Sequence, residues 1–362
     1  MSRVRIIVGD CRSALAKMPD ESVQCVVTSP PYWGLRDYGT ATWENGDAGC
    51  DHRHPAEQRQ LPHGDGRAND SYADERVAKK GVGAMYRKLC AKCGAQRVDQ
   101  QIGLEDAPDA YVSELVAVFR EVRRVLRADG TLWLNLGDSY TSGGRTWRSE
   151  DKKPPGARGM DSRAATPDGL KPKDLVGIPW RVAFALQADG WYLRSDIIWH
   201  KPNPMPESVR DRPTSAHEHI FLLAKSQRYF YDADAIRESD EGKPSGNGFV
   251  REHRLSYAGR GDAEQWTPSG GRNKRNVWTV TTQPFPDAHF AVYPPQLIEP
   301  CVLAGSAEGD TVLDPFAGSG TTGLVALRHN REFIGCELNP EYAQMARERI
   351  VDDAPLLNTE AA

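Results

Sequence analysis

The sequence predicts an α/β protein with a doubly wound sheet of seven strands and two insertions at the rim of the sheet. Short β-rich runs that end in polar or glycine residues alternate with helical patterns, as in a parallel sheet with crossover helices. A glycine-rich turn follows the sixth run, and only one more strand, with a helix on either side of it, comes after this turn. The other strands must come from the amino-terminal part, so the predicted fold is a circularly permuted, Rossmann-like sheet.

The predicted strands are short apolar runs bounded by turn residues, at residues 4–8, 24–28, 131–136, 194–199, 219–224, 311–313 and 332–336. The clearest helix, 111–126, carries apolar residues at i, i+3 and i+4 spacing and precedes Asp129-Gly130, a helix-stop and turn signal. Two further helices are expected at 321–329 and 340–351, the second with Pro340 in its first turn.

Composition is that of a globular protein rich in loops. The chain has 362 residues, 39% of them hydrophobic, with 33 glycines and 25 prolines. No apolar run approaches the ~20 residues that span a bilayer. The amino-terminus enters a strand pattern at once, without a long apolar stretch and cleavage site, so we expect a cytoplasmic protein that does not contact a membrane.

The net charge of −4 excludes a global basic field that would hold a nucleic acid. Any such contact must use local patches. Between residues 141 and 173 there are eight Lys or Arg and four acids. This stretch is typical of a solvated loop, and it is equally suited to closing over a phosphate backbone.

A glycine-rich loop follows the strand that ends at Asp314, with the spacing Gly318-x-Gly320-x-x-Gly323. Glycines allow a backbone to approach a ligand closely, and the following helix offers free N–H groups. The spacing satisfies a dinucleotide fingerprint, with Glu337 as the ribose-binding acid, so a nicotinamide oxidoreductase is one hypothesis. A carboxylate at Asp314 suits the cationic amino-acid tail of S-adenosylmethionine better than a pyrophosphate.

The segment Ser29-Pro30-Pro31-Tyr32 stands at the carboxyl end of the second strand, where α/β sheets bind ligands. The prolines remove two donors, so the turn presents hydrogen-bond acceptors on a rigid backbone. The Ser29 hydroxyl and the Pro30 carbonyl can accept from the two N–H groups of an amino nitrogen on a planar ring and stabilise charge that develops there. Tyr32 could stack on that ring once the base is flipped out of a duplex.

With these two motifs in this order, the chain resembles the β-class DNA amino-methyltransferases, which make N4-methylcytosine or N6-methyladenine. The resemblance implies S-adenosylmethionine as cofactor and identifies Ser29-Pro30-Pro31-Tyr32 with the family's catalytic motif. It implies a cofactor site formed by Asp10, Tyr293, Asp314, Phe316, Gly318, Ser319, Gly320, Thr321, Thr322 and Glu337.

Other segments extend the resemblance. Val8-Gly9-Asp10 resembles the segment near the adenine ring, and Phe290-Ala291-Val292-Tyr293-Pro294 resembles the turn that holds the methionine end of the cofactor. Trp199-His200-Lys201-Pro202-Asn203 together with His217-Glu218-His219 resembles the stretch that lines the target-base pocket.

Serine in the first position of the catalytic motif favours cytosine N4, and adenine N6 is the runner-up. A DNA-binding protein without activity is a third hypothesis, against which the intact motifs count. Pro300-Cys301 contains the dipeptide of C5-cytosine enzymes, but it precedes the glycine loop within an apolar helical pattern, so we expect a buried core cysteine.

Cysteine and histidine residues are grouped in a polar insertion. Cys50-x-His52 is followed by Cys90-x-x-Cys93-Gly94, and the set Cys50, His52, Cys90 and Cys93 would suit a structural Zn²⁺. His54 and His63 compete with His52 as ligands. Seven cysteines, an odd number, with no secretion signal, favour reduced thiols.

The resulting domain prediction has three parts. Residues 1–42, 98–230 and 287–362 form the catalytic core, 43–97 the Cys/His insertion, and 231–286 the target-recognition region. The last contains arginines interleaved with aromatic residues, which favours contact with double-stranded DNA, although they could equally be surface residues. A homodimer and a cognate restriction enzyme are left open.

Overall fold

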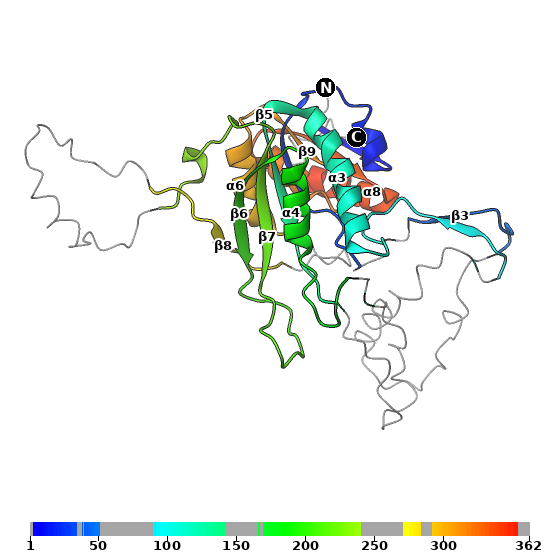
Figure 1. The fold of residues 1–362 in the computed structure, drawn as a ribbon. Coiled ribbons are helices and arrows are strands. Elements are labelled where there is room, and N and C mark those ends of the chain that lie inside the picture. The colour runs from blue at the N-terminus through cyan, green and yellow to red at the C-terminus, as the bar shows by residue number, and fades with distance from the viewer. Residues whose placement is uncertain are drawn as a thin grey trace, which may run out of the picture.

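The main sheet has eight strands in the order β1-β10-β9-β2-β5-β7-β6-β8. Figure 1 shows β7, β6 and β8 side by side in this sheet. The computed structural model describes residues 3–34, 38, 40–50, 90, 92–141, 166, 169–239, 271–283 and 292–353. The strands are β1 (Val4–Val8), β2 (Val23–Thr28), β5 (Leu126–Leu136), β6 (Tyr192–His200), β7 (His217–Ala224), β8 (Val277–Thr279), β9 (Thr311–Asp314) and β10 (Glu332–Glu337). A separate ribbon pairs β3 (Thr42–Glu44) with β4 (Gln96–Val98).

Strand direction decides which residues meet at each edge. β1, β10, β9, β2 and β5 are parallel, β7 is antiparallel to β5 and β6, and β8 is parallel to β6. One edge, called here the site edge, therefore holds the carboxyl ends of all these strands except β7, which contributes its amino end. The chain goes from β9 to β10 on one side and from β2 to β5 on the other. The β9–β2 boundary is thus the switch point at which doubly wound sheets bind ligands.

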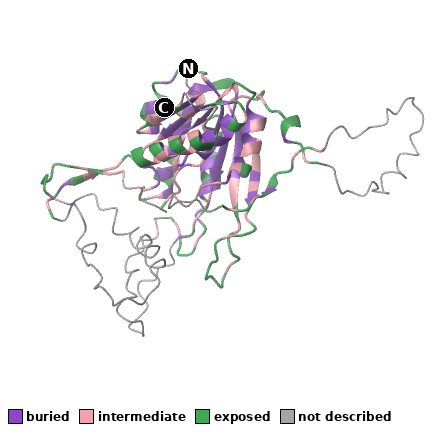
Figure 2. Ribbon diagram, turned by 180° about the vertical axis from the view of Figure 1, so that it is seen from behind, coloured by how far each residue is buried: buried purple, intermediate pink, exposed green. Residues whose placement is uncertain are grey.

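Among the described residues, three helices cover each face of the sheet. One core includes residues of α1 (Cys11–Leu15), α3 (Pro108–Val125) and α4 (Ile178–Ala188). The other includes residues of α6 (Pro295–Gly305), α7 (Thr321–Arg328), α8 (Pro340–Asp353) and the short 3₁₀ helix η3 (Asp234–Ile236). Figure 2 shows the buried strands between the helices, whose outer faces are exposed. None of the described helices is long and apolar enough to cross a membrane.

The local sequence explains the elements nearest the site. α3 begins with Pro108, whose fixed φ suits a first helical turn, and buries one apolar face that includes Tyr111, Leu115 and Phe119. β2 is buried along its whole length because helices cover both faces of the sheet, and four of its six residues are apolar, the exceptions being Gln24 and Thr28.

The structure confirms the seven predicted strands and adds β8, which is too short and too isolated among polar residues to give a periodic signal. α3, α7 and α8 correspond to the three predicted helices. The turn expected at Asp129-Gly130 is wrong, since both residues lie within β5. A Cβ atom on Gly130 would lie 2.9 Å from the Gln24 carbonyl oxygen and 2.5 Å from Leu126 Cγ, so glycine permits a close approach between strands there.

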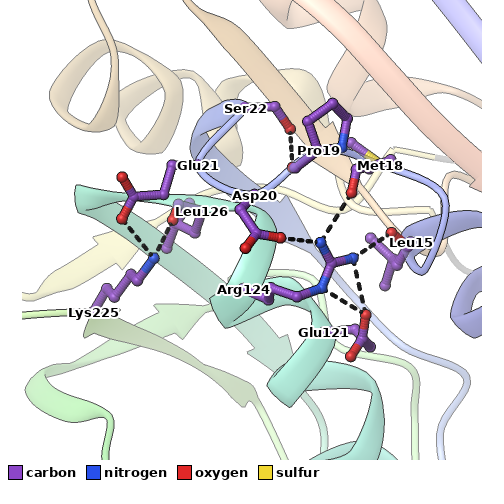
Figure 3. Close-up of polar contacts among 10 residues, drawn as sticks. All are labelled: Leu15, Met18, Pro19, Asp20, Glu21, Ser22, Glu121, Arg124, Leu126 and Lys225. Atoms are coloured by element: carbon purple, nitrogen blue, oxygen red, sulfur yellow. Dashed lines mark hydrogen bonds and ion pairs between the residues drawn. The ribbon is translucent and has the colours of Figure 1, made fainter.

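The edge opposite the site is held together by one arginine near the end of α3 (Figure 3). Arg124 donates to the carbonyl oxygens of Leu15 at 2.7 Å and Met18 at 2.9 Å, and pairs with Asp20 and Glu121. These bonds tie the loop between α1 and β2 to α3, so this edge stabilises the sheet and takes no part in the site.

Candidate active site

The two sequence motifs meet at the switch point of the sheet. Thr28, the last residue of β2, donates a hydrogen bond of 2.6 Å from its hydroxyl to Asp314 Oδ1 at the end of β9. Ser29 follows on one strand and the glycine-rich loop on the other. The predicted catalytic turn and the predicted cofactor loop are therefore neighbours, although 286 positions separate the bonded residues.

Asp314 is only 1% exposed, and its carboxylate accepts from four donors. Besides Thr28, these are the Phe316 N–H at 3.0 Å, the Thr322 hydroxyl at 2.6 Å and the Tyr293 hydroxyl at 3.1 Å. Burial raises the pKa of Asp314, and the hydrogen bonds, led by that of Thr28, act in the opposite direction. The side chain points into the fold and joins β2, β9, α7 and the segment that precedes α6.

The glycine-rich loop uses its glycines for different reasons. Gly318 and Gly320 have φ of 51° and 76°, a left-handed conformation that favours glycine. A Cβ atom on Gly323 would lie 2.6 Å from Ile350 and Phe333, so this glycine lets α7 pack closely on its neighbours. Arg349 donates to Ser319 Oγ at 3.0 Å and Thr321 Oγ1 at 2.8 Å, which fixes these two side chains against α8.

Glu337 ends β10, the strand next to β9. Its Oε2 accepts the Gly318 N–H at 2.8 Å and its Oε1 accepts the Asn339 N–H at 2.9 Å. Burial raises the pKa of the Glu337 carboxyl, and these backbone donors oppose that shift. Each carboxylate oxygen can accept a second hydrogen bond. Two vicinal ribose hydroxyls fit this donor requirement.

Asp10 lies at the same edge, beyond the end of β1. The Gly9 N–H donates to the Glu337 carbonyl at 2.8 Å, which places Asp10 beside the end of β10. Its carboxylate caps α1 by accepting the Ser13 N–H at 3.1 Å and pairs with Arg12 at 2.9 Å. The described contacts of Asp10 are thus structural, and its place next to Glu337 fits the predicted contact with the cofactor.

The Ser29-Pro30-Pro31-Tyr32 turn is held by a hydrogen bond from α3 and packs against the end of β5. The Tyr111 hydroxyl of α3 donates to the Pro31 carbonyl at 2.9 Å. A Cβ atom on Gly137 would lie 2.6 Å from the Tyr32 ring, so glycine at this position, directly after β5, leaves room for the ring. Pro30 is buried, whereas Ser29 is half-buried. Tyr32 is half-buried, and its predicted stacking on a base stays a prediction.

A polar network fixes Tyr32 from the side of β7. Its hydroxyl lies 2.6 Å from Glu218 Oε2, and Asn135 Nδ2 donates to the same oxygen at 3.2 Å. Lys201 forms an ion pair with Oε1 of Glu218, and its Nζ lies 4.3 Å from the centre of the Trp199 ring. Burial raises the pKa of the Tyr32 hydroxyl, and the Glu218 charge adds to that effect.

The network joins the stretches around Lys201 and Glu218 to the catalytic motif. Sequence reasoning placed both stretches at the target base but did not connect them to Tyr32, and it missed Asn135. A polar residue at the last but one position of a buried strand, here β5, is the signal that would have indicated Asn135.

Some predicted residues lie outside the described part of the chain. These are His52, Phe290 and Ala291, most of the basic stretch 141–173 and residues 240–270 of the target-recognition region. Cys50, Cys90 and Cys93 are described and lie together. Cys301 is fully buried in α6, as expected for a core residue, and burial raises the pKa of its thiol.

Comparisons with known proteins identify the family of the chain. A family model described as DNA methylase matches residues 23–348. Type II methyltransferase M.Cfr9I of Citrobacter freundii is 46% identical over 342 residues, which cover 94% of this chain and 86% of that protein. Type II methyltransferase M.SmaI of Serratia marcescens is 46% identical over 347 residues, covering 96% of this chain and 90% of that protein.

Two solved structures share the fold. PvuII DNA methyltransferase, described as cytosine-N4-specific, has a TM-score of 0.53 and 16% identity and covers 99% of this chain and 95% of that one. The putative DNA modification methylase TTHA0409 of Thermus thermophilus, solved with S-adenosyl-L-methionine, has a TM-score of 0.51, 24% identity and coverages of 97% and 95%. The chain belongs to the family of S-adenosylmethionine-dependent DNA amino-methyltransferases, which modify cytosine N4 or adenine N6.

Proposed function

We propose that the protein methylates the exocyclic N4 of a cytosine that is flipped out of double-stranded DNA, and that Ser29-Pro30-Pro31-Tyr32 holds the target amino group. The observation that carries this proposal is the direct bond between Thr28 and Asp314, which puts the Ser29 turn against the loop predicted for the cofactor. Adenine N6 is the second candidate, since its amino group offers the same two N–H donors. Serine as the first residue of the motif favours cytosine.

The cofactor side of the proposal consists of two carboxylates and the loop between them. S-adenosylmethionine supplies an electrophilic methyl group when it is bound. Glu337 accepts the ribose hydroxyls through the acceptor positions that Gly318 and Asn339 leave open. Asp314 fixes the loop, and its buried charge favours a nearby cation because such a charge is poorly screened.

The rest of the predicted cofactor set belongs to this proposal in lesser roles. Phe316 and Tyr293 hold Asp314, Gly318 and Gly320 shape the loop, and Thr322 ties it to β9. Ser319 and Thr321 act through Arg349, which fixes the start of α7, and Asp10 lies at the adenine end.

The proposed role of Ser29 toward the target base follows from the direction of donation in a chain of hydrogen bonds. Lys201 pairs with Glu218, so Glu218 is ionised and only accepts. Tyr32 must then donate to Glu218, and its oxygen accepts from the Ser29 hydroxyl, 3.5 Å away. This direction leaves the lone pairs of Ser29 free to accept from the amino group of the base. Ser29 is thereby set as an acceptor before the base arrives.

The same chain provides a path for the proton. The amino nitrogen would take the methyl group that bound S-adenosylmethionine supplies, and it would then carry a positive charge and one proton more than the product. One proton then passes from nitrogen to Ser29, from Ser29 to Tyr32 and from Tyr32 to Glu218. The acidity of the cationic nitrogen makes this transfer favourable even to a carboxylate that is paired with Lys201.

The remaining parts of the proposal concern partners and domains. We infer that residues 231–286 read the DNA sequence, that the basic stretch 141–173 contacts phosphates, and that the core comprises 1–42, 98–230 and 287–362. The relatives M.Cfr9I and M.SmaI are named Type II methyltransferases, which supports a cognate restriction enzyme here as well. We also infer a cytoplasmic location. A metal enters only as a structural element, and no step of the reaction uses it.

The test is to incubate the purified protein with DNA and S-adenosylmethionine that carries a labelled methyl group, digest the DNA to nucleosides and identify the product by mass. The expected product is N4-methylcytosine. Ser29→Ala should reduce its formation strongly while S-adenosylhomocysteine binding persists. N6-methyladenine as the product would transfer the proposal to adenine, and activity of Ser29→Ala equal to that of the unchanged protein would contradict the role of the turn.

A further inference from the structure

Three cysteines come together beside the β3–β4 ribbon, outside the proposed active site. The Sγ atoms of Cys50, Cys90 and Cys93 all lie within 4.8 Å of one another. The other four cysteines are buried in the two cores of the sheet and are not part of this cluster; they are Cys11, Cys25, Cys301 and Cys336.

The separation of two of the sulfur atoms matches that of ligands on one tetrahedral metal ion. Cys50 Sγ and Cys90 Sγ are 3.8 Å apart, far beyond the ~2.05 Å of a disulfide. Tetrahedral Zn²⁺ binds thiolates at about 2.3 Å, and the edge of such a tetrahedron is longer by a factor of about 1.63, which gives about 3.8 Å. The observed separation equals that edge length.

Two backbone hydrogen bonds join Cys90 to the residues that follow Cys93, as in a metal knuckle. The Gly94 N–H donates to the Cys90 carbonyl at 2.9 Å, and the Cys90 N–H donates to the Ala95 carbonyl at 2.7 Å. Gly94 has a φ of 73°, and a Cβ atom there would meet nothing within 4 Å, so only the backbone conformation requires glycine. This closed turn holds the thiols of Cys90 and Cys93 on the same side.

The ribbon is too small to order this region by itself. β3 and β4 have three residues each and pair only through Thr42–Val98, Trp43–Arg97 and Glu44–Gln96. A two-stranded ribbon is at best marginally stable in water. A metal that links Cys50, just beyond β3, to the knuckle just before β4 would close the ribbon at its open end, and its binding free energy would become folding free energy.

We propose that Cys50, Cys90 and Cys93 bind a structural Zn²⁺, and that this metal holds the edge of the cofactor site in place. The three thiols each release a proton on binding and coordinate as thiolates. The sequence offers His52 as the fourth ligand, with His54 and His63 as alternatives, and all three lie outside the described residues.

The second part of this proposal rests on the proposed role of Glu337 and follows a chain of contacts. Asp99, directly after β4, accepts the Thr40 hydroxyl and the Gln101 N–H, each at 3.0 Å. Gln101 Oε1 accepts the Tyr38 N–H at 2.8 Å, and the Tyr38 carbonyl accepts from Asn339 Nδ2 at 3.3 Å.

Asn339 in turn donates its N–H to Glu337. The ribbon is therefore linked to the carboxylate proposed for the ribose through backbone and side-chain bonds alone. Loss of the metal loosens the ribbon and, through this chain, the geometry around Glu337.

The first experiment measures metal in the full-length protein. Elemental analysis after gel filtration should give one zinc per chain, and Co²⁺ substitution should give the spectrum of a tetrahedral site with three thiolates. Cys50→Ser and Cys93→Ser should lose the metal, whereas Cys11→Ser, in the core, should keep it. Comparing His52→Ala, His54→Ala and His63→Ala assigns the fourth ligand.

A folded unchanged protein with far less than one zinc per chain would overturn the site. Full zinc content in Cys50→Ser with an unaltered cobalt spectrum would do the same.

The second experiment titrates S-adenosylhomocysteine into zinc-loaded and zinc-depleted protein by calorimetry. Depletion should weaken binding about tenfold or more, and restored zinc should recover it. Equal affinity in both forms would contradict the link to Glu337 but not the metal site. Absence of binding to the zinc-loaded protein would instead contradict the proposed cofactor site, so the two failures are distinguishable.

Discussion

The hydroxyl of Thr28 and the carboxylate of Asp314 form a 2.6 Å hydrogen bond between the central strands β2 and β9. Both groups are buried, so the bond is shielded from water and links the catalytic turn to the cofactor loop. Thr28→Val keeps the shape of the side chain and removes the donor. We expect a loss of about 1.5–3 kcal/mol in unfolding free energy, the range for a hydrogen bond to a charged group.

Chemical denaturation measures this loss. The matched control is Thr311→Val at the other end of β9, whose hydroxyl has only a 3.5 Å contact with exposed Glu332 and should matter little. If the two variants are equally stable, the Thr28 hydrogen bond does not contribute the expected free energy of unfolding.

Asp314→Asn tests whether the charge of Asp314 acts on cofactor binding separately from the stability of the fold. Burial raises the pKa of Asp314, so the charged form costs more in the fold than in water, and a neutral amide removes that cost. We expect a melting temperature close to that of the unchanged protein and S-adenosylhomocysteine binding that is weaker by about tenfold or more, since the buried charge no longer acts on the cofactor. Calorimetry with both S-adenosylhomocysteine and the methyl donor checks this. Unchanged affinity for the cationic methyl donor would exclude an electrostatic role.

Glu337→Gln should show a pH-dependent difference in stability. Because the folded-state pKa of Glu337 is raised, its stabilising contribution is complete below the pKa of the unfolded chain and is lost as the pH rises through the folded-state pKa. The stability of the variant minus that of the unchanged protein should therefore increase from acidic to neutral pH. Thermal melts of both proteins across this range provide the measurement, and a difference that grows toward acid would show the wrong sign.

Tyr32→Phe should lower kcat by about tenfold to a hundredfold with little effect on cofactor affinity, because the phenyl ring still packs on Gly137 while the chain from Ser29 to Glu218 is broken. Glu218→Gln should have a similar effect, since an amide can reverse the donor direction at Tyr32. Tyr192→Phe, an exposed residue at the other end of β6, is the control. Single-turnover rates decide: a normal methyl-transfer rate in Tyr32→Phe would rule out the proposed chain.

Arg124→Ala should destabilise the fold without changing the active site. It removes the bonds to the Leu15 and Met18 carbonyls, at a cost of about 1–3 kcal/mol. Arg124→Lys keeps a charge but not the planar fork, so it should recover only part of the loss. Denaturant unfolding together with the kinetics of the folded protein tests both statements. A fall in kcat per folded molecule would contradict the statement that this edge takes no part in the site.

The sequence predicted those parts of the fold and site whose signal is local. Asp314, Gly318 and Gly320 lie within one short segment of the chain, so their loop could be recognised before the sheet was known. The contacts of Glu218 and Asn135 with Tyr32 depend on β7 lying antiparallel beside β5, a pairing that no local pattern encodes.

Gly130 illustrates the opposite case, in which a local signal was misleading. After a helix and an aspartate, glycine indicates a turn, yet Gly130 lies within β5, where a Cβ atom would meet Leu126 and also the carbonyl oxygen of Gln24, on a strand distant in sequence. Sequence patterns report what a residue permits, and tertiary contacts decide which of the permitted roles it takes.

The pairing of Trp43 with Arg97 has a consequence for how this protein can change. This pairing brings the two ends of the insertion together, and the entropy of closing a longer loop rises only slowly with its length. We therefore expect that the intervening segment can be shortened or extended at little cost in closure entropy, provided that Cys50, Cys90, Cys93 and their fourth ligand still meet.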